Sequence, residues 1–464
     1  MPANPCKIPP VTKEVNDDNL FAQQAVYGVI TMDVVGTFGN FVDEWSESAP
    51  ARARWLLKTG WQAQDLRYRF MPEKRLSKGD QYLADYMMRM MIRPLRAPEQ
   101  SVLVSVFTPC ELIQEAGLYP YNVESFSCYL TGSQAERAFL QDAEDAGLSE
   151  TLCSYHKTFI GAALSGVLPK PSCIVYTNLA CDANLLTFRY LSEYYQVPAF
   201  AIDVPAAQTQ ANIDYVAQQL RDMEAFLEKH TGRKIDPDAL RERVERGRRT
   251  LKKFDCFQTQ RADKYIMTDL VSPMYVGMTN NIFLGMEEEE HLIDLMLDGL
   301  KSAPSAKGRR IYWMHTIPFW SQAVRDALAL NEDIQIVGCE LAQTVDPDIA
   351  YADPYEQMAA RLVYHNLNGS ITRRIDAGIR HTRQAGADGA VWFNHWGCKH
   401  TLGGSQLARR KFEEAGIPLL VLDGDGVDRS HGGEGQTATR LGAFLEMLTE
   451  DHESAALSGG AAHE

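Results

Sequence analysis

The chain lacks the segments that would direct it into or across a membrane. Its first 20 residues contain no basic segment followed by an apolar run, and no stretch of about 18 apolar residues occurs anywhere. Positive charge is also scarce, because 46 Lys and Arg residues face 61 Asp and Glu residues and the net charge is −15. This balance argues against nucleic acid or a membrane surface as the main partner. We therefore expect a protein of the reducing cytoplasm.

Several common catalytic motifs are missing as well. The sequence has no G-x-S-x-G, no H-E-x-x-H and no Cys-His signature of a hydrolase. It has no Walker loop or G-x-G-x-x-G, and the glycine-rich stretch at 423–436 is interpreted as a plain loop, with an anion-binding nest as the alternative. Any use of ATP must then belong to a partner protein. No C-x-x-C pair occurs, so a zinc ribbon and a ferredoxin-type run are excluded.

Nine cysteines are present, and three of them have an informative setting. In a reducing compartment they are expected to be free, metal-bound or catalytic rather than paired. Cys153, Cys181 and Cys398 each lie close to a point where a strand-like or connecting segment gives way to a helix. Such points converge on a ligand in an open α/β sheet, and thiolate selects iron–sulfur clusters, zinc or copper(I). The hypothesis is one cluster held by sequence-distant cysteines, against the alternative of ordinary core residues.

The other cysteines and the flanking side chains give weaker signals. Cys110 has a similar position after a strand and is the main rival as a ligand, whereas Cys339 is undecided. The remaining four are interpreted as structural or incidental: Cys6, Cys128, Cys173 and Cys256. His395, Lys399 and His400 flank Cys398 and could donate hydrogen bonds to a cluster or a bound acyl group, although histidines near loops are more often structural.

The hydrophobic pattern predicts an α/β protein with two doubly wound parallel-sheet domains, an N-terminal helical segment and a helical insert. Apolar runs rich in β-branched residues mark the expected strands at 101–107, 173–177, 199–204, 310–314, 334–337, 390–393 and 419–422. The expected divisions are an arm and helical segment at 1–99, a first α/β domain at 100–207, a charged helical insert at 208–301, a second α/β domain at 302–453 and a disordered tail at 454–464.

Five stretches in a fixed order resemble the 2-hydroxyacyl-CoA dehydratase family, which also contains benzoyl-CoA reductase subunits and double-cubane cluster proteins. They are PCELIQEAGLYP, LCSYHKTFIGAALSG, TNLACDAN, ADGAVWFNHWGCKHTLGG and AGIPLLVLDGDGVDR. The resemblance covers roughly residues 100–205 and 310–450. The order of these motifs is far more specific than any one of them.

The resemblance implies that Cys153, Cys181 and Cys398 bind one 4Fe–4S cluster and leave its fourth iron open. Cys110 falls at the variable position of the family's P-x-E-L motif, which weakens its claim. An ATP-hydrolysing activator would deliver one electron, and an (R)-2-hydroxyacyl-CoA would lose water through a ketyl radical to give a 2-enoyl-CoA, as in anaerobic amino-acid fermentation. His395 and Lys399 are the side chains expected to contact substrate or cluster.

Alternatives within the same family stay open. The leading expectation is one subunit of a heterodimeric dehydratase. A benzoyl-CoA reductase-type protein or a homodimeric double-cubane cluster reductase is the second. A third is an electron-transfer subunit whose cluster never meets substrate. The sequence does not identify the acyl chain.

Overall fold

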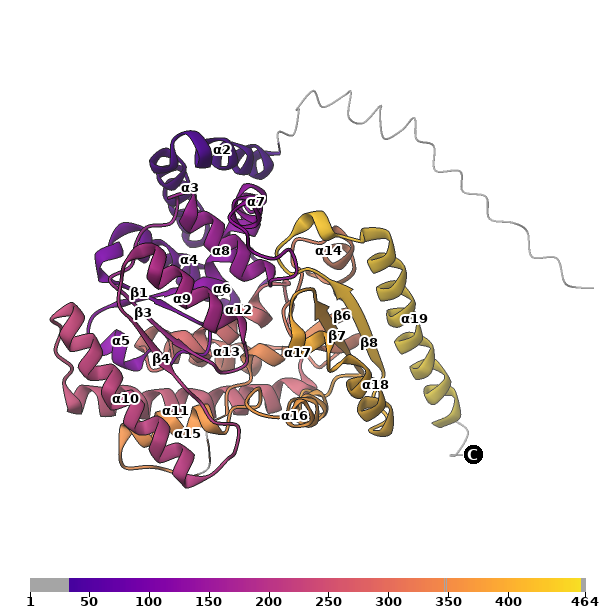
Figure 1. Cartoon of the computed structure of the whole chain (residues 1–464). Coiled ribbons are helices and arrows are strands. Elements are labelled where there is room, and N and C mark those ends of the chain that lie inside the picture. Colours follow the sequence, from indigo (N-terminus) through magenta and orange to yellow (C-terminus); the bar gives the residue numbers. More distant parts are fainter. Residues whose placement is uncertain (1–32, 346, 348, 460–464) are drawn as a thin grey trace, which may run out of the picture.

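The computed structural model describes residues 33–459 apart from 346 and 348, and it consists of two α/β units that lie side by side (Figure 1). Each unit contains a four-stranded sheet, ordered β2-β1-β3-β4 in the first and β6-β5-β7-β8 in the second, and all strand pairs are parallel. In each sheet the chain adds one neighbour on one side and then crosses to the other side. This confirms the predicted fold class.

The first sheet is formed by β1 (Ser101–Val104), β2 (Tyr119–Asn122), β3 (Cys173–Thr177) and β4 (Ala199–Ile202). The two inner strands, β1 and β3, are buried along their whole length, as expected of apolar runs covered on both faces. The helices of this unit are α5 (Glu111–Glu115), α6 (Val123–Gly132), α7 (Arg137–Asp145), α8 (Ser154–Leu164) and α9 (Ala183–Tyr195).

The second sheet is formed by β5 (Arg309–Met314), β6 (Ile334–Cys339), β7 (Gly389–His395) and β8 (Leu419–Gly424). Helices α16 (Ile371–Gln384) and α18 (Ser405–Glu414) pack on one face, and α14 (Gln322–Leu328) and α19 (Glu434–Gly459) pack on the other. Two further helices, α15 (Pro354–Val363) and the short α17 (Lys399–Leu402), complete this unit. Its core centres on the fully buried Trp313, Trp392 and Phe393.

Helices from two further parts of the chain pack around the sheets. The N-terminal helices are α2 (Val34–Ser48), α3 (Pro50–Phe70) and α4 (Lys78–Arg96), and the insert supplies α10 (Gln210–Thr231), α11 (Pro237–Gln260), α12 (Ser272–Ile282) and α13 (Glu287–Ser302). Helix α13 packs on both α4 and α11, while α10 packs on β4 of the first unit and α15 of the second. The side chains of Thr209 and Asp236 cap the N-termini of α10 and α11. The insert therefore packs against both units and connects them.

All seven predicted strands occur, but one strand was not predicted. Strand β2 has the sequence YPYN, which lacks β-branched residues and contains Pro120. A proline removes a backbone donor and is tolerated in a sheet mainly at an edge, and β2 is an edge strand paired only with β1. Its local sequence therefore resembles a turn.

Only one of the two expectations for the chain ends can be compared with the structure. The polar arm at 1–20 lies outside the described residues. At the other end α19 continues to Gly459, past residue 454 where disorder was expected to begin, and residues 460–464 lie outside the described part. Alanines and a leucine at 455–457 favour helix, which explains the extension. Within residues 33–459, no helix is long and apolar enough to cross a membrane.

Candidate functional site

The carboxyl ends of the strands in both sheets face a common cavity of about 390 Å³. In each sheet the chain changes direction between the two inner strands, which is where ligands of open α/β folds bind. Cys181 follows β3, His315 follows β5, and Cys398 follows β7, whereas Cys153 is the N-cap of α8. All four side chains line the cavity. The cavity is therefore built by both units together.

Each of the three predicted cysteines has an imidazole as its neighbour. The S···Nε2 distances are 3.2 Å for Cys153 and His395, 3.7 Å for Cys181 and His156, and 3.5 Å for Cys398 and His315. The rings of His315 and His395 are stacked with centroids 5.9 Å apart, which links the contact of Cys153 to that of Cys398. The structure thus brings the three thiols to one cavity. Their role as ligands stays a prediction.

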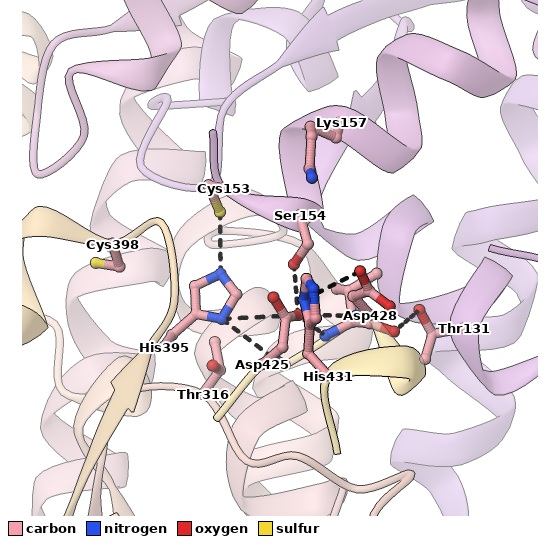
Figure 2. A network of polar contacts seen from close by, with 12 residues as sticks. Thr131, Cys153, Ser154, Lys157, Thr316, His395, Cys398, Asp425, Asp428 and His431 are labelled. Carbon is pink, nitrogen blue, oxygen red and sulfur yellow. Dashed lines mark hydrogen bonds and ion pairs between the residues drawn. The ribbon is translucent and has the colours of Figure 1, made fainter. Parts of the chain in front are cut away.

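The hydrogen bonds of His395 determine which of its ring nitrogens carries the proton (Figure 2). The backbone N–H of Gly426 donates to Nδ1 at 3.0 Å, and burial lowers the pKa of His395, so the ring is neutral. Nδ1 is then the acceptor, and Nε2 carries the hydrogen and donates to the Cys153 sulfur. Asp425 does not compete, because its Oδ1 lies 3.9 Å from Nδ1 and already accepts from Ser154 and from two backbone N–H groups of its own loop.

The three thiols differ in how readily they ionise. Burial, and then the charges of Cys181 and Cys398, raise the pKa of Cys153 well above its ordinary value. Burial and Cys398 raise the pKa of Cys181 to about 12. For Cys398 burial also acts upward, but Arg374, His395 and hydrogen bonds from Thr401 bring its pKa below the ordinary value.

The burial of three thiols in one cavity bears on whether the site suits a metal cluster. Three thiolates in one buried cavity repel one another unless a cationic group lies between them. Soft sulfur donors in that number fit an iron–sulfur cluster, whose irons would remove this repulsion. The three cysteines and their surroundings therefore fit the group that the sequence resemblance implies.

A buried ion pair supports the side of the cavity formed by the second unit. Arg374 donates to both oxygens of Glu340, at 2.7 and 2.6 Å, and Glu340 also accepts from the backbone N–H of His315 at 3.0 Å. His315 has a positive φ of 78°, which is uncommon for a residue with a side chain. The pair thus fixes the turn that follows β5 and keeps a guanidinium near Cys398.

A carboxyl group on the cavity wall was not predicted from the sequence. Glu124 lies in the first turn of α6, directly after β2, and lines the cavity. Its Oε1 accepts from the backbone N–H of Val106 at 3.3 Å, and its Oε2 accepts from the Asn122 amide at 2.8 Å. Burial raises its pKa to about 7. Recognition of β2 would have marked Glu124 as a strand-end residue.

The remaining cysteines are sorted by their positions. Cys128, which the sequence suggested to be structural, lines the same cavity, and burial raises its pKa to about 12. Cys110 is fully buried outside the residues that line the cavity, where its thiol contacts the carbonyl of Thr108 at 3.2 Å. Cys339 contacts the carbonyl of His315 at 3.3 Å. Cys173 is the first residue of β3, Cys256 is exposed, and Cys6 lies outside the described residues.

The two expected catalytic side chains lie in different environments. His395 is buried and its Nε2 contacts the Cys153 sulfur, while its backbone carbonyl accepts a hydrogen bond from the N–H of Cys398 at 3.0 Å. Lys399 is exposed at the rim, and its side chain has no hydrogen bond or ion pair within the described residues. It lines both the cysteine cavity and an adjoining surface groove of about 550 Å³. The glycine-rich stretch at 423–436 is mainly a loop, as expected, that packs Asp425 against α8.

Gly397 sets the distance between the two units at the site. Its φ is +82°, and a Cβ there would lie 2.7 Å from the Cα of Cys153. Gly397→Ala is therefore expected to lower the free energy of unfolding by roughly 3 kcal/mol, of which about 1–2 kcal/mol is the left-handed backbone and the rest the contact. Gly416→Ala is the matched control, since φ is +67° with nothing within 4 Å. Urea unfolding of both variants is the measurement, and equal losses would contradict the close contact.

Comparison with known proteins confirms the family resemblance that the sequence motifs suggested. Residues 105–448 match the family described as 2-hydroxyglutaryl-CoA dehydratase, D-component. The (R)-2-hydroxyisocaproyl-CoA dehydratase alpha subunit of Clostridioides difficile is 25% identical over 378 residues, which cover 75% of this chain and 89% of the relative. The (R)-phenyllactyl-CoA dehydratase alpha subunit of Clostridium sporogenes is 22% identical over 371 residues, with the same coverage. A benzoyl-CoA reductase subunit of Thauera aromatica is 21% identical over 356 residues, which cover 69% of this chain and 82% of the relative.

Proposed function

The chain belongs to the 2-hydroxyglutaryl-CoA dehydratase D-component family, and we propose that it is the iron–sulfur subunit of a 2-hydroxyacyl-CoA dehydratase. In this proposal it removes water from an (R)-2-hydroxyacyl-CoA to give a 2-enoyl-CoA, through a ketyl radical of the substrate. The observation that carries the proposal is that Cys153, Cys181 and Cys398, far apart in the sequence, line one cavity between two sheets.

The three thiols would hold a 4Fe–4S cluster, with one iron free of protein ligands. When bound, the cluster supplies single electrons at low potential and an open iron. The protein's own contribution is to hold and shield the sulfurs. His395 donates a hydrogen bond to Cys153, and Arg374 adds positive charge near Cys398. Hydrogen bonds and charges of this kind tune a cluster's potential.

Elimination of water moves one proton away from the β-carbon of the substrate. Glu124 lines the cavity, and with a pKa of about 7 it is partly ionised at neutral pH. We assign to it the acceptance of the β-proton, because a general base works best when its pKa lies near the working pH. Lys399, exposed at the rim between the cavity and the adjoining groove, would contact the acyl-CoA as it enters.

Two partner proteins belong to the proposal. Relatives include both the alpha and the beta subunit of the phenyllactyl-CoA dehydratase of Clostridium sporogenes, which fits a second subunit here and a heterodimer. The absence of a nucleotide-binding motif from the sequence favours a separate ATP-dependent activator as the source of the electron. The composition favours the cytoplasm as its place of work.

A reductase of the benzoyl-CoA type is the second candidate, favoured by the similarity to the benzoyl-CoA reductase subunit of Thauera aromatica. The two functions differ in electron balance. Loss of water consumes no electrons overall, whereas reduction of a ring consumes two electrons for each product. Counting reductant consumed for each product formed therefore separates them.

The test is reconstitution without oxygen. The chain alone is expected to be inactive on any 2-hydroxyacyl-CoA, and activity should require the partner subunit, the activator, ATP, Mg²⁺ and a strong reductant. Exposure to air should abolish it. Formation of 2-enoyl-CoA is followed by mass spectrometry with a series of acyl chains. Dehydration by the isolated chain in air and without ATP would overturn the radical mechanism.

A further inference from the structure

A second cavity of about 290 Å³ lies apart from the cysteines of the candidate site. The start of α4, the end of α11, helix α12 and the carboxyl end of β6 enclose it. Most of its wall is apolar, and its lining includes Leu76, Phe254, Phe257, Ile266, Val276 and Met296. A concave, mostly apolar wall with a few polar groups is typical of a small-molecule site.

One wall of this cavity carries a buried cation that forms no direct ion pair with the described residues. Arg261 is 6% exposed, and its Nη2 is fully buried without a hydrogen-bond partner. Its guanidinium lies over the ring of Phe257 at 5.4 Å, and within residues 33–459 it forms no ion pair. Burial lowers its pKa to about 10, so it is charged at neutral pH. Buried charges in proteins are usually paired, so an unpaired guanidinium indicates a missing anion.

Among the other polar side chains that line this cavity, Gln258 and Asp80 bear most directly on the binding of an anion. Gln258 is 4% exposed and makes no side-chain hydrogen bond within the described part of the chain. Asp80 is also buried, but its Oδ2 already accepts from the Ser77 hydroxyl at 2.7 Å, and it lies beyond ion-pair distance of Arg261. Arg75 also lines the cavity but pairs with Glu73, so among the described residues Arg261 is the cation without an ion pair and Gln258 the amide without a hydrogen bond.

We propose that this cavity binds a small monocarboxylic acid with an apolar chain, with its carboxylate on Arg261 and Gln258 and its chain among the aromatic and aliphatic side chains. A guanidinium and a carboxylate match as two parallel hydrogen bonds. A single negative charge is favoured over a phosphate, because Arg261 is the buried cation of this wall and Asp80 lies on the same wall. The inference does not depend on the proposed dehydratase function, since Cys153, Cys181 and Cys398 do not line this cavity.

The test uses the full chain and hexanoate as the probe, with hexanamide as the neutral analogue. Calorimetry is expected to show hexanoate binding at least tenfold tighter than hexanamide, because only the acid forms charge-assisted hydrogen bonds. Arg261→Met should weaken hexanoate binding at least tenfold. It should change the unfolding midpoint of the ligand-free chain only slightly, because no direct ion pair of Arg261 within the described residues is broken and Asp80 loses only a more distant positive charge.

Controls keep the test specific. Arg249→Met, on the exposed side of α11, should leave hexanoate binding unchanged, and so should Cys398→Ser, which separates this site from the cysteine cavity. If Arg261→Met does not fold, Arg261→Lys serves instead and should fold and bind hexanoate more weakly. Equal binding of hexanoate and hexanamide, unchanged binding in the arginine variant, or no binding at all would each overturn the proposal and leave a cavity filled by water only.

Discussion

Serine in place of Cys153, Cys181 or Cys398 is expected to remove most of the iron from the anaerobically purified protein. The three thiols line one cavity, so loss of one leaves two ligands from the protein for a group that needs three. Serine is close in size to cysteine but is a poor ligand for iron in a sulfur cluster. Iron and acid-labile sulfide for each chain, with electron paramagnetic resonance of the reduced protein, are the measurements.

Three other cysteines provide matched controls. Cys256→Ser, at an exposed position on α11, should keep its iron. Cys110→Ser should also keep it, because that thiol is buried against Thr108 and does not line the cavity. Cys128→Ser changes the cavity wall without removing a proposed ligand. Full iron in Cys181→Ser or Cys398→Ser would refute the assignment, and loss in Cys110→Ser alone would move the third ligand there.

Glu124→Gln is expected to lower the turnover of the reconstituted enzyme by about 10²–10⁴-fold, the usual contribution of general acid–base catalysis. Glutamine keeps the shape of the side chain and can still accept from the backbone N–H of Val106, but it cannot take a proton. Iron content should not change. Glu115→Gln, whose carboxylate pairs with Arg243 away from the cavity, is the control and should keep full turnover.

The pH dependence gives this prediction a second readout. With a pKa of about 7 in the folded protein, Glu124 changes from mostly protonated to mostly ionised as the pH rises through that value. Turnover should therefore rise through about pH 7, and this rise should vanish in the glutamine variant. Burial raises the pKa of Glu124 in the folded protein above its value in the unfolded chain, so protonation of Glu124 favours the folded state. The free energy of unfolding should therefore be highest at low pH and should fall as the pH rises through about 7. Urea titrations of the cluster-free chain at several pH values should show this fall in unfolding free energy. A loss of turnover smaller than tenfold in Glu124→Gln, with full iron content, would exclude Glu124 as the general base.

Most of the fold could be predicted from the sequence because its inner strands are runs of β-branched and aromatic residues. CIVYT and AVWF are short, apolar and followed by helical patterns, which is typical of buried parallel strands. Strand β2 was missed because YPYN resembles a turn and is stabilised by its pairing with β1. Glu124 was missed for the same reason: it follows β2, and a polar residue is recognised as a strand-end residue only when the strand itself has been predicted.

The cysteine positions could be inferred because each lies near a strand end or heads a helix, but their neighbours could not. His156 and His315 face thiols that lie 25 and 83 residues away in the sequence, each within its own unit, and the contact of His315 depends on the pairing of β5 with β7. The contact of His395 with the Cys153 sulfur could not be predicted either, because the two residues lie 242 positions apart in the sequence and belong to different units. Arg261 follows a helix rich in charge, and nothing local distinguishes a buried arginine from its solvated neighbours.

The division of the cysteine site between two units has a consequence during translation. Cys398 follows Cys181 by 217 residues, so at about 5–20 residues per second the ribosome needs roughly 10–40 s to complete the set of thiols. During that interval the first unit can fold with Cys153 and Cys181 in place but with nothing to oppose them. On the proposed assignment, insertion of a cluster would follow release of the second unit from the exit tunnel, and the nascent chain would carry two open thiols until then.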